Sequence, residues 1–346
     1  GYLIEAVSGN LHAFSTPLEA AQYYDGLVGN PYWGVFFHFL FLLCCIAILY
    51  FGVRGGIERG NKIMMPTLFV MMVALVIKGL MMPNAGEALT FLFSPNWSLL
   101  TPSAILLALG QAFFTLSLGQ GTMVTYGSYL CKKTNILGTI IPVVVMDTVI
   151  SLMSAVAIFT IVFSVGMQPD SGPGLIFHTL PWVFSQVPGG FYLGILFFLL
   201  VTLAAMTSEI SALEPAIAYL RDQRGWGRHS AVFACGAASF MIGVPCALSF
   251  SLLKDTLLFG MNVLDFMAFI CSSIMIPLGG LFAVLLTGWV WGFANSMVNL
   301  SEGNDGVMVR YPWLQRYFWI SFKFTAPLLI MIVFISALGF FDFTSA

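Results

Sequence analysis

The stretch from Pro102 to Leu130 constrains this chain most, because it carries no charged side chain and is longer than one membrane crossing requires. An α-helix rises about 1.5 Å per residue, and the hydrocarbon core of a bilayer is about 30 Å thick. Within this stretch, Gly119-Gln120-Gly121 places a polar amide between two residues that weaken helices, and Thr115 and Ser117 come just before. The pattern predicts a membrane helix that is broken near its middle.

Two interpretations of this break are open. Backbone groups freed inside a membrane are tolerated only where protein or a polar cavity satisfies them. Transporters use such breaks, with hydroxyl groups beside them, to hold ions and solutes near the bilayer midplane. The alternative is a kinked span whose small residues serve only close helix packing.

The whole chain has the composition of a polytopic all-α membrane protein. Hydrophobic residues make up 59% and charged residues 8% of it, and the mean hydropathy is +0.94. A soluble domain has about 25% charged residues. The sequence has no glycine-rich phosphate loop, no HExxH motif, no nucleophile–base pattern and no basic array, so we expect neither an enzyme nor a nucleic-acid-binding protein.

Eight apolar spans follow a short stub in chain order. Residues 1–14 have the pattern of the end of a helix, and a polar stretch covers residues 15–31. Because the chain begins at Gly1 rather than at a methionine, we expect the sequence to be a piece of a longer protein. Two loops are predicted, at residues 54–62 and 166–190. The predicted spans are Tyr32–Val53, Ile63–Met82, Pro102–Leu130, Leu137–Val165, Phe191–Leu220, Ala231–Phe250, Val263–Phe293 and Trp319–Phe341.

Basic side chains alternate between the two sets of loops. Ten of the thirteen Lys and Arg lie in every second loop, whereas the other loops contain only Lys254. Cytoplasmic loops are enriched in Lys and Arg. The alternation therefore predicts a plasma-membrane protein, such as one of a bacterial inner membrane, with its C-terminus outside. The ten are Arg54, Arg59, Lys62, Lys132, Lys133, Arg221, Arg224, Arg228, Arg310 and Arg316.

Polar residues inside the spans are costly and usually functional. Asp147 lies well inside the fourth span with Ser151 one helical turn later, and Thr207-Ser208 lies in the fifth. Hydroxyl and carbonyl oxygens suit a hard cation such as Na⁺. The alternatives are a structural hydrogen bond for Asp147 and close helix packing for the hydroxyls. His38 stands alone in an aromatic span, and we expect its imidazole to be a hydrogen-bonded interior group.

Several motifs, in one order, resemble those of the neurotransmitter:sodium symporter family, which includes bacterial amino-acid transporters. GQAFFTLSLGQG at 110–121 is similar to the family's sixth helix, and the likeness extends from about residue 30 to the end of the chain. It implies the family's leucine-transporter-like inverted-repeat fold. On this mapping, residues 1–346 form one transmembrane domain with the end of helix 3 and helices 4–11, while helices 1–2 and most of helix 3 are missing. The other matching segments are Gly56–Arg59, Lys62–Phe69, Leu180–Gly190, Ala205–Ser208 and Glu214-Pro215.

The resemblance also implies roles for particular residues. The substrate pocket would be lined by Phe114, Ser117, Gln120, Ser208 and Ala212. The first sodium site would use oxygens of Thr115 and Asp147. The second would use the Ala204 carbonyl and the hydroxyls of Thr207 and Ser208. Charge compensation, or an anion site, would involve Gln111, Asp147 and Ser151. The gates would include Tyr129, Asp222 and Asp265.

The function implied by the resemblance is sodium-coupled symport of a small solute, an amino acid or a related amine, by alternating access. Na⁺ would be the coupling ion, and chloride would not be required because Asp147 supplies a negative charge. The expected partners are the solute and membrane lipid, without nucleic acid, and a homodimer is left open. The alternative functions are a transport-dead or regulatory homologue and an ion channel.

Overall fold

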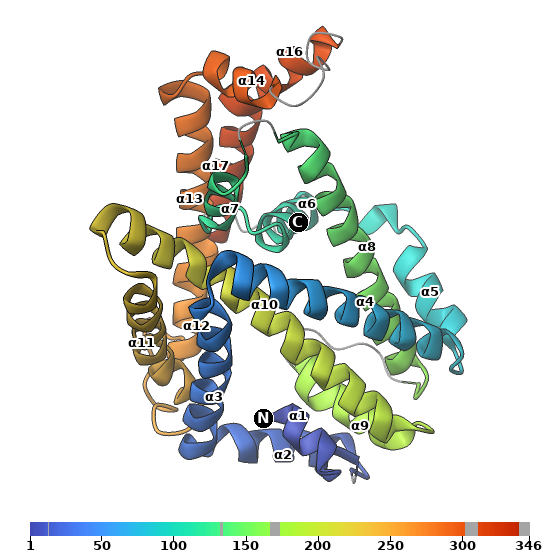
Figure 1. Ribbon diagram of the computed structural model, residues 1–346. Coiled ribbons are helices and arrows are strands. Elements are labelled where there is room, and N and C mark those ends of the chain that lie inside the picture. The colour runs from blue at the N-terminus through green and yellow to red at the C-terminus, as the bar shows by residue number, and fades with distance from the viewer. Residues whose placement is uncertain (13, 132–133, 167–173, 302–310, 339–346) are drawn as a thin grey trace. The chain divides into compact units, whose positions relative to one another are not determined.

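The computed structural model describes residues 1–12, 14–131, 134–166, 174–301 and 311–338, and within them the chain is almost entirely helical (Figure 1). The only strand-like feature in these residues is an isolated bridge between Leu258 and Met261. The chain folds as two compact units. Unit 1 comprises Gly1–Pro95 and Val149–Leu264, and unit 2 comprises Asn96–Thr148 and Asp265–Ala346.

Seven of the described helices are long and apolar enough to cross a membrane. They confirm seven of the eight predicted spans, with differences mainly at the ends. Three of them include short π-helical turns, at the start, inside or at the end of the helix. The seven are Pro31–Tyr50 (α3), Val53–Leu80 (a π turn and α4, Arg59–Leu80), Ile136–Phe163 (α8), Gly190–Arg224 (α10), Arg228–Ala247 (α11), Val263–Val290 (α12, Val263–Ala268, and α13, Ile276–Leu285, each followed by a π turn), and Pro312–Ala337 (α16, Pro312–Ile320, a π turn and α17, Ala326–Ala337).

The remaining predicted span is broken, as its sequence indicates. α6 covers Pro102–Thr115 and α7 covers Thr122–Ser128, and the residues between them are not helical. The other described helices are short: α1 (Tyr2–Val7), α2 (Pro17–Val28), α5 (Ala85–Phe93), α9 (Leu180–Gln186) and α14 (Phe293–Ser301).

The two predicted loops are wrong as loops. Residues Val53–Glu58 form a π-helical turn that leads directly into α4. Charged side chains allow a helix to extend beyond the bilayer. Lys62 and Glu58, one helical turn apart, form such a charged pair, with Nζ 2.7 Å from Oε1. The segment 166–190 contains the π turn Leu175–Thr179 and α9. Lys132, Lys133 and Arg310, which contributed to the predicted orientation, lie outside the described residues.

Three helices begin at a capping residue followed by proline. The side-chain oxygens of Thr16, Asn30 and Thr101 each accept a backbone N–H from the first turn of the helix that follows. Proline is favourable at the next position because its fixed φ suits a helix and its missing N–H would have no partner there. These local signals therefore set where α2, α3 and α6 begin.

The core of unit 1 includes a cluster where α3, α10 and α11 meet. Leu49, Ile210 and Val232 are at most 1% exposed in it. A Cβ on Gly236 would lie 2.3 Å from Ile46 Cδ1, so this glycine lets α11 approach α3 closely. The two helices run side by side (Figure 1). The packing fixes the rotation of α10, which carries the predicted sodium ligands.

Candidate ion and solute sites

The break between α6 and α7 has an unusual backbone. The amide of Leu118 donates to the Phe113 carbonyl at 3.1 Å, which closes the end of α6. Ser117 then adopts φ 52°, and Gly119 and Gly121 adopt φ 81° and 82°. Positive φ is accessible to glycine but costly for serine, and such residues cluster at functional sites. The sequence Gly-Gln-Gly therefore has the flexibility that this turn requires.

The break is seated against α13 in unit 2 by direct backbone contact. A Cβ on Gly119 would lie 2.0 Å from the Ile276 carbonyl oxygen. In return, a Cβ on Gly279 would lie 2.1 Å from the Gly119 oxygen, and one on Gly280 would lie 2.5 Å from the Phe113 ring. Only glycines allow this approach. Gly279 and Gly280 were not predicted from the sequence, although a Gly-Gly pair inside an apolar helix is a signal of close packing.

Some of the side chains predicted for the solute and the first sodium ion lie at this break or in α6 just before it. Thr115 Oγ1 donates to the Ala112 carbonyl at 3.4 Å, and Ser117 and Gln120 are partly buried. Gln111 and Phe114 line the same cavity of about 450 Å³ in unit 2. The structure thus groups Gln111 with Phe114. Three serines on neighbouring helices, which the sequence analysis did not single out, line the same cavity: Ser272, Ser273 and Ser336.

Asp147 lies on α8 in unit 2 and is partly buried. The ion pairs that the structure describes do not include it. Ser151 follows one turn later on the same continuous helix and is exposed. Of the predicted gate residues in unit 2, Tyr129 lies beside Tyr126, with ring centroids 6.4 Å apart, and Asp265 is exposed in the first turn of α12.

The predicted second sodium site lies on α10 in unit 1. Thr207 Oγ1 donates to the Ala204 carbonyl at 2.8 Å, so these two oxygens are already adjacent. Ser208 is exposed next to Thr207, and Ala212 is exposed one turn further along. Neutral hydroxyl and carbonyl oxygens at this spacing fit the ligand preference of a hard monovalent cation. Asp222, the gate residue of this unit, pairs with the adjacent Arg221 at 2.8 Å on an exposed surface.

The predicted solute pocket draws on both units. Phe114, Ser117 and Gln120 belong to unit 2, whereas Ser208 and Ala212 belong to unit 1. Each group has the local geometry described above. That the two groups form one pocket stays a prediction.

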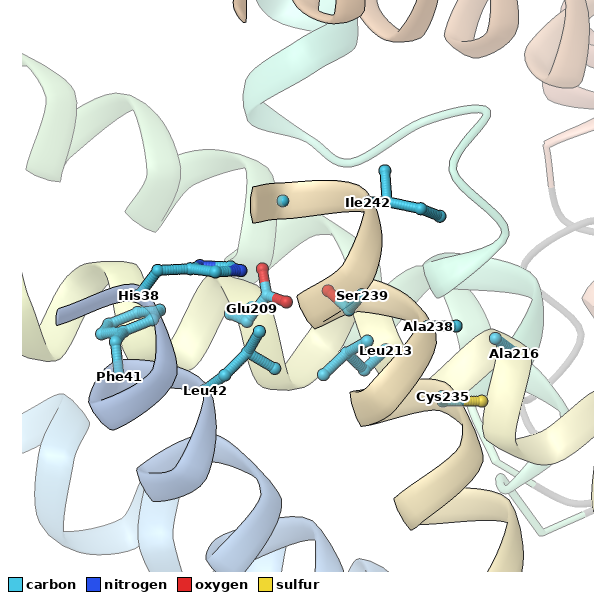
Figure 2. A pocket seen from close by; sticks show the side chains of 11 residues that line it. His38, Phe41, Leu42, Glu209, Leu213, Ala216, Cys235, Ala238, Ser239 and Ile242 are labelled. Carbon is cyan, nitrogen blue, oxygen red and sulfur yellow. The ribbon is translucent and has the colours of Figure 1, made fainter. Parts of the chain in front are cut away.

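A polar cavity in unit 1 was not predicted. It has a volume of about 480 Å³ and lies among α3, α10 and α11, and His38, Glu209 and Ser239 face into it from these three helices (Figure 2). The expectation that His38 is hydrogen-bonded is wrong, because its buried Nε2 has no partner among the described residues. Its position in one helix says nothing of the groups that other helices bring near it, so the sequence pattern could not reveal this.

A buried ion pair in unit 1 was also missed. Glu214 on α10 is completely buried and pairs with Arg228, which begins α11. The sequence analysis assigned Arg228 only to a cytoplasmic loop. The signal available in the sequence was a glutamate beside a helix proline, followed by an arginine where the next helix begins.

Comparisons with known proteins point to one family. The model of the sodium:neurotransmitter symporter family matches residues 26–344. An uncharacterized sodium-dependent transporter of Bacillus subtilis, YhdH, is 36% identical over 99% of this chain and 75% of its own length. A similarly named protein of Haemophilus influenzae is 34% identical over 97% of this chain and 73% of its own length.

A solved structure extends the likeness to three dimensions. The crystal structure of MhsT in complex with L-phenylalanine is 39% identical and matches with a TM-score of 0.83, covering 97% of this chain and 75% of that chain. This match confirms the predicted leucine-transporter-like fold of a multi-pass membrane protein. The chain therefore belongs to the sodium:neurotransmitter symporter family.

Proposed function

We propose that this protein is a sodium-coupled symporter that moves an amino acid or a related amine by alternating access. The observation that supports it best is the pair of oxygens of Ala204 and Thr207, 2.8 Å apart on α10. The same chain has a break at Ser117–Gly121, in the segment that resembles the sixth helix of the family. The names of the two bacterial relatives, and the L-phenylalanine in the MhsT structure, agree with sodium coupling and with an amino-acid substrate.

In the proposed mechanism, oxygen ligands on the two sides of each site are held together by the positive charge of a bound Na⁺. Ala204, Thr207 and Ser208 would hold one ion from α10, and Thr115 and Asp147 would contribute to the other. These oxygens would hold Na⁺ best when both sides of a site are assembled. Bound Na⁺ would therefore stabilise the assembled state relative to states in which the two sides are apart. The membrane potential adds about 2.3 kcal/mol per charge per 100 mV to the drive.

The solute would be held by the break itself. Ser117 and Gln120 would offer polar groups to it, Phe114 an aromatic wall, and Ser208 and Ala212 the facing surface on α10. Tyr129, Asp222 and Asp265 would act as gates on either side. We further infer that the ten Lys and Arg of the charge alternation face the cytoplasm and that the C-terminus lies outside. A C-terminal alkaline phosphatase fusion, which is active only outside the cytoplasm, would test the orientation.

The function is tested by uptake in proteoliposomes that contain the full-length protein. A panel of labelled amino acids, phenylalanine included, is offered with an inward Na⁺ gradient or with K⁺ in its place. We expect at least one to accumulate only with Na⁺, and accumulation to collapse when an ionophore dissipates the gradient. Solute binding without uptake would instead support a transport-dead homologue. Unitary currents in single-channel recordings would support an ion channel.

A further inference from the structure

The polar cavity of unit 1 combines three polar groups with apolar walls. The imidazole of His38 comes from α3, the carboxylate of Glu209 from α10 and the hydroxyl of Ser239 from α11, and they point toward a common space (Figure 2). Much of the remaining lining is apolar and includes Phe41 and Leu213. The volume of about 480 Å³ is within the range of pockets for small molecules.

Glu209 has no fixed positive partner in this setting. The ion pairs that the structure describes are Lys62–Glu58, Arg221–Asp222 and Arg228–Glu214. The titratable groups that face Glu209 from the packed helices are His38 and Cys45 on α3, and Cys235 on α11 also lines the cavity. A carboxylate among apolar helices is costly unless a cation or hydrogen-bond donors compensate it.

The imidazole of His38 is held in a defined position. Its ring stacks on Phe240, with centroids 5.3 Å apart and an interplanar angle of 9°. A Cβ on Gly243 would lie 2.4 Å from Nε2, so the ring fills the space that this glycine leaves. The Nε2 atom is buried and has no hydrogen-bond partner among the described residues.

We propose that this cavity binds a small amphipathic primary amine. A primary ammonium has three N–H donors, and the cavity offers acceptors in the Glu209 carboxylate and Ser239 Oγ, while the His38 ring forms part of its wall. The apolar body of the amine would lie against Phe41 and Leu213. A neutral apolar molecule would leave the carboxylate with only the hydrogen bond from Ser239 and no cation beside it. A bare metal ion would leave the apolar volume unfilled, and the described residues contain no group of three or more His, Cys, Asp or Glu that could hold a metal ion.

The proposal is tested by direct binding, which does not depend on transport. The full-length protein in nanodiscs, in sodium-free potassium buffer, is titrated with 4-fluorophenethylamine, and binding is followed by ¹⁹F NMR line broadening. The matched probe is 4-fluorophenethyl alcohol, which has the same ring and chain but no charge. We expect the amine to bind at least tenfold more tightly than the alcohol. Equal binding of both probes would overturn the proposal in favour of an apolar pocket.

Three variants locate the binding. Glu209→Gln should weaken amine binding at least tenfold, whereas Glu87→Gln, the same change at an exposed site of unit 1, should not alter it. Ala238→Phe should block the cavity without touching the carboxylate, and Gly243→Ala should weaken binding by displacing His38. Amine binding that survives both Glu209→Gln and Ala238→Phe would lie elsewhere and would overturn the proposal. If Glu209→Gln fails to fold, Ala238→Phe alone decides.

Discussion

Glu214 and Arg228 form a two-bond ion pair, with Nη1–Oε1 and Nη2–Oε2 distances of 3.0 Å, across the turn between α10 and α11. Arg228 also donates from Nε and Nη2 to the carbonyl of Leu49 on α3, at 3.3 Å. Glu214 is completely buried, and the Arg228 side chain is 16% exposed. One guanidinium thus joins the C-terminal end of α3, the interior of α10 and the start of α11, and these three helices line the polar cavity.

Glu214→Gln should therefore destabilise the protein. Removing one partner of a buried ion pair leaves an uncompensated charge, which typically lowers the free energy of unfolding by about 3 kcal/mol or more. The measurement is chemical unfolding in detergent micelles, compared with Glu58→Gln, which removes an exposed pair and should change little. Equal unfolding of the two variants would mean that the pair does not hold the helices together.

Gly119→Ala should destabilise unit 2 and abolish uptake. The new methyl group would meet the Ile276 carbonyl oxygen at 2.0 Å, and the residue would keep a φ of 81°. The left-handed conformation alone costs about 1–2 kcal/mol for a residue with a Cβ. Gly127→Ala is the matched control, because nothing lies within 4 Å of its Cβ position in α7. Thermal unfolding and uptake are compared, and a Gly119→Ala variant as active as the control would contradict the close seating.

The sequence predicted features that depend on neighbouring residues along the chain. The break at Gly119–Gly121 was predicted because glycine, amide and hydroxyl groups stand together there, and the spans were predicted from apolar runs. Contacts between distant helices were not predictable, since a single sequence does not give helix rotation or separation. This is why the approach of Gly279 to Gly119, and the meeting of His38 with Glu209, were missed.

Replacing both Thr207 and Ser208 with alanine should raise the Na⁺ concentration that gives half-maximal uptake. The two hydroxyls are proposed ligands beside the Ala204 carbonyl, and alanine removes both without changing the helix propensity unfavourably. Thr202→Ala is the control, because this hydroxyl lies on the same helix and bonds only the Phe198 carbonyl at 2.7 Å. Uptake is measured against Na⁺ at equal surface expression. An unchanged sodium response would remove these hydroxyls from the site.

Alkaline pH should weaken unit 1 through Tyr23. Burial, together with a hydrogen bond to the Glu5 carboxylate and its charge, raises the pKa of Tyr23 to about 12. An unfolded tyrosine has a pKa near 10. The folded state thus binds the phenol proton more tightly, so this contribution is complete below pH 10 and is lost as the pH rises from 10 to 12.

Unfolding is measured from pH 8 to pH 12 in the original protein and in Tyr23→Phe. The variant cannot lose a proton at this position, so its stability should fall less steeply above pH 10. Tyr32→Phe is the control, because Tyr32 is 85% exposed. Parallel pH profiles for Tyr23→Phe and the original protein would show that Tyr23 does not contribute.

Asp147→Asn should make transport depend on chloride or abolish it. Ser151 lies one turn from Asp147 on α8, and an ionised Asp147 would place a fixed negative charge in the proposed anion cluster. Two anions 4 Å apart repel by about 4 kcal/mol at an effective dielectric near 20. Asp147 would therefore exclude chloride and compensate the charge of Na⁺ itself.

Uptake is measured with chloride and with gluconate in its place, for the original protein, for Asp147→Asn and for Asp25→Asn. Asp25 is exposed on α2, so its variant reports the loss of one negative charge far along the chain from the proposed ligands. We expect the original protein and Asp25→Asn to transport equally in both anions, because Asp147 is present in each. Asp147→Asn should lose uptake in gluconate and regain part of it in chloride, since only an added anion can then balance Na⁺. Chloride dependence of the original protein, or unchanged uptake by Asp147→Asn in gluconate, would show that the Asp147 charge does not take the place of chloride.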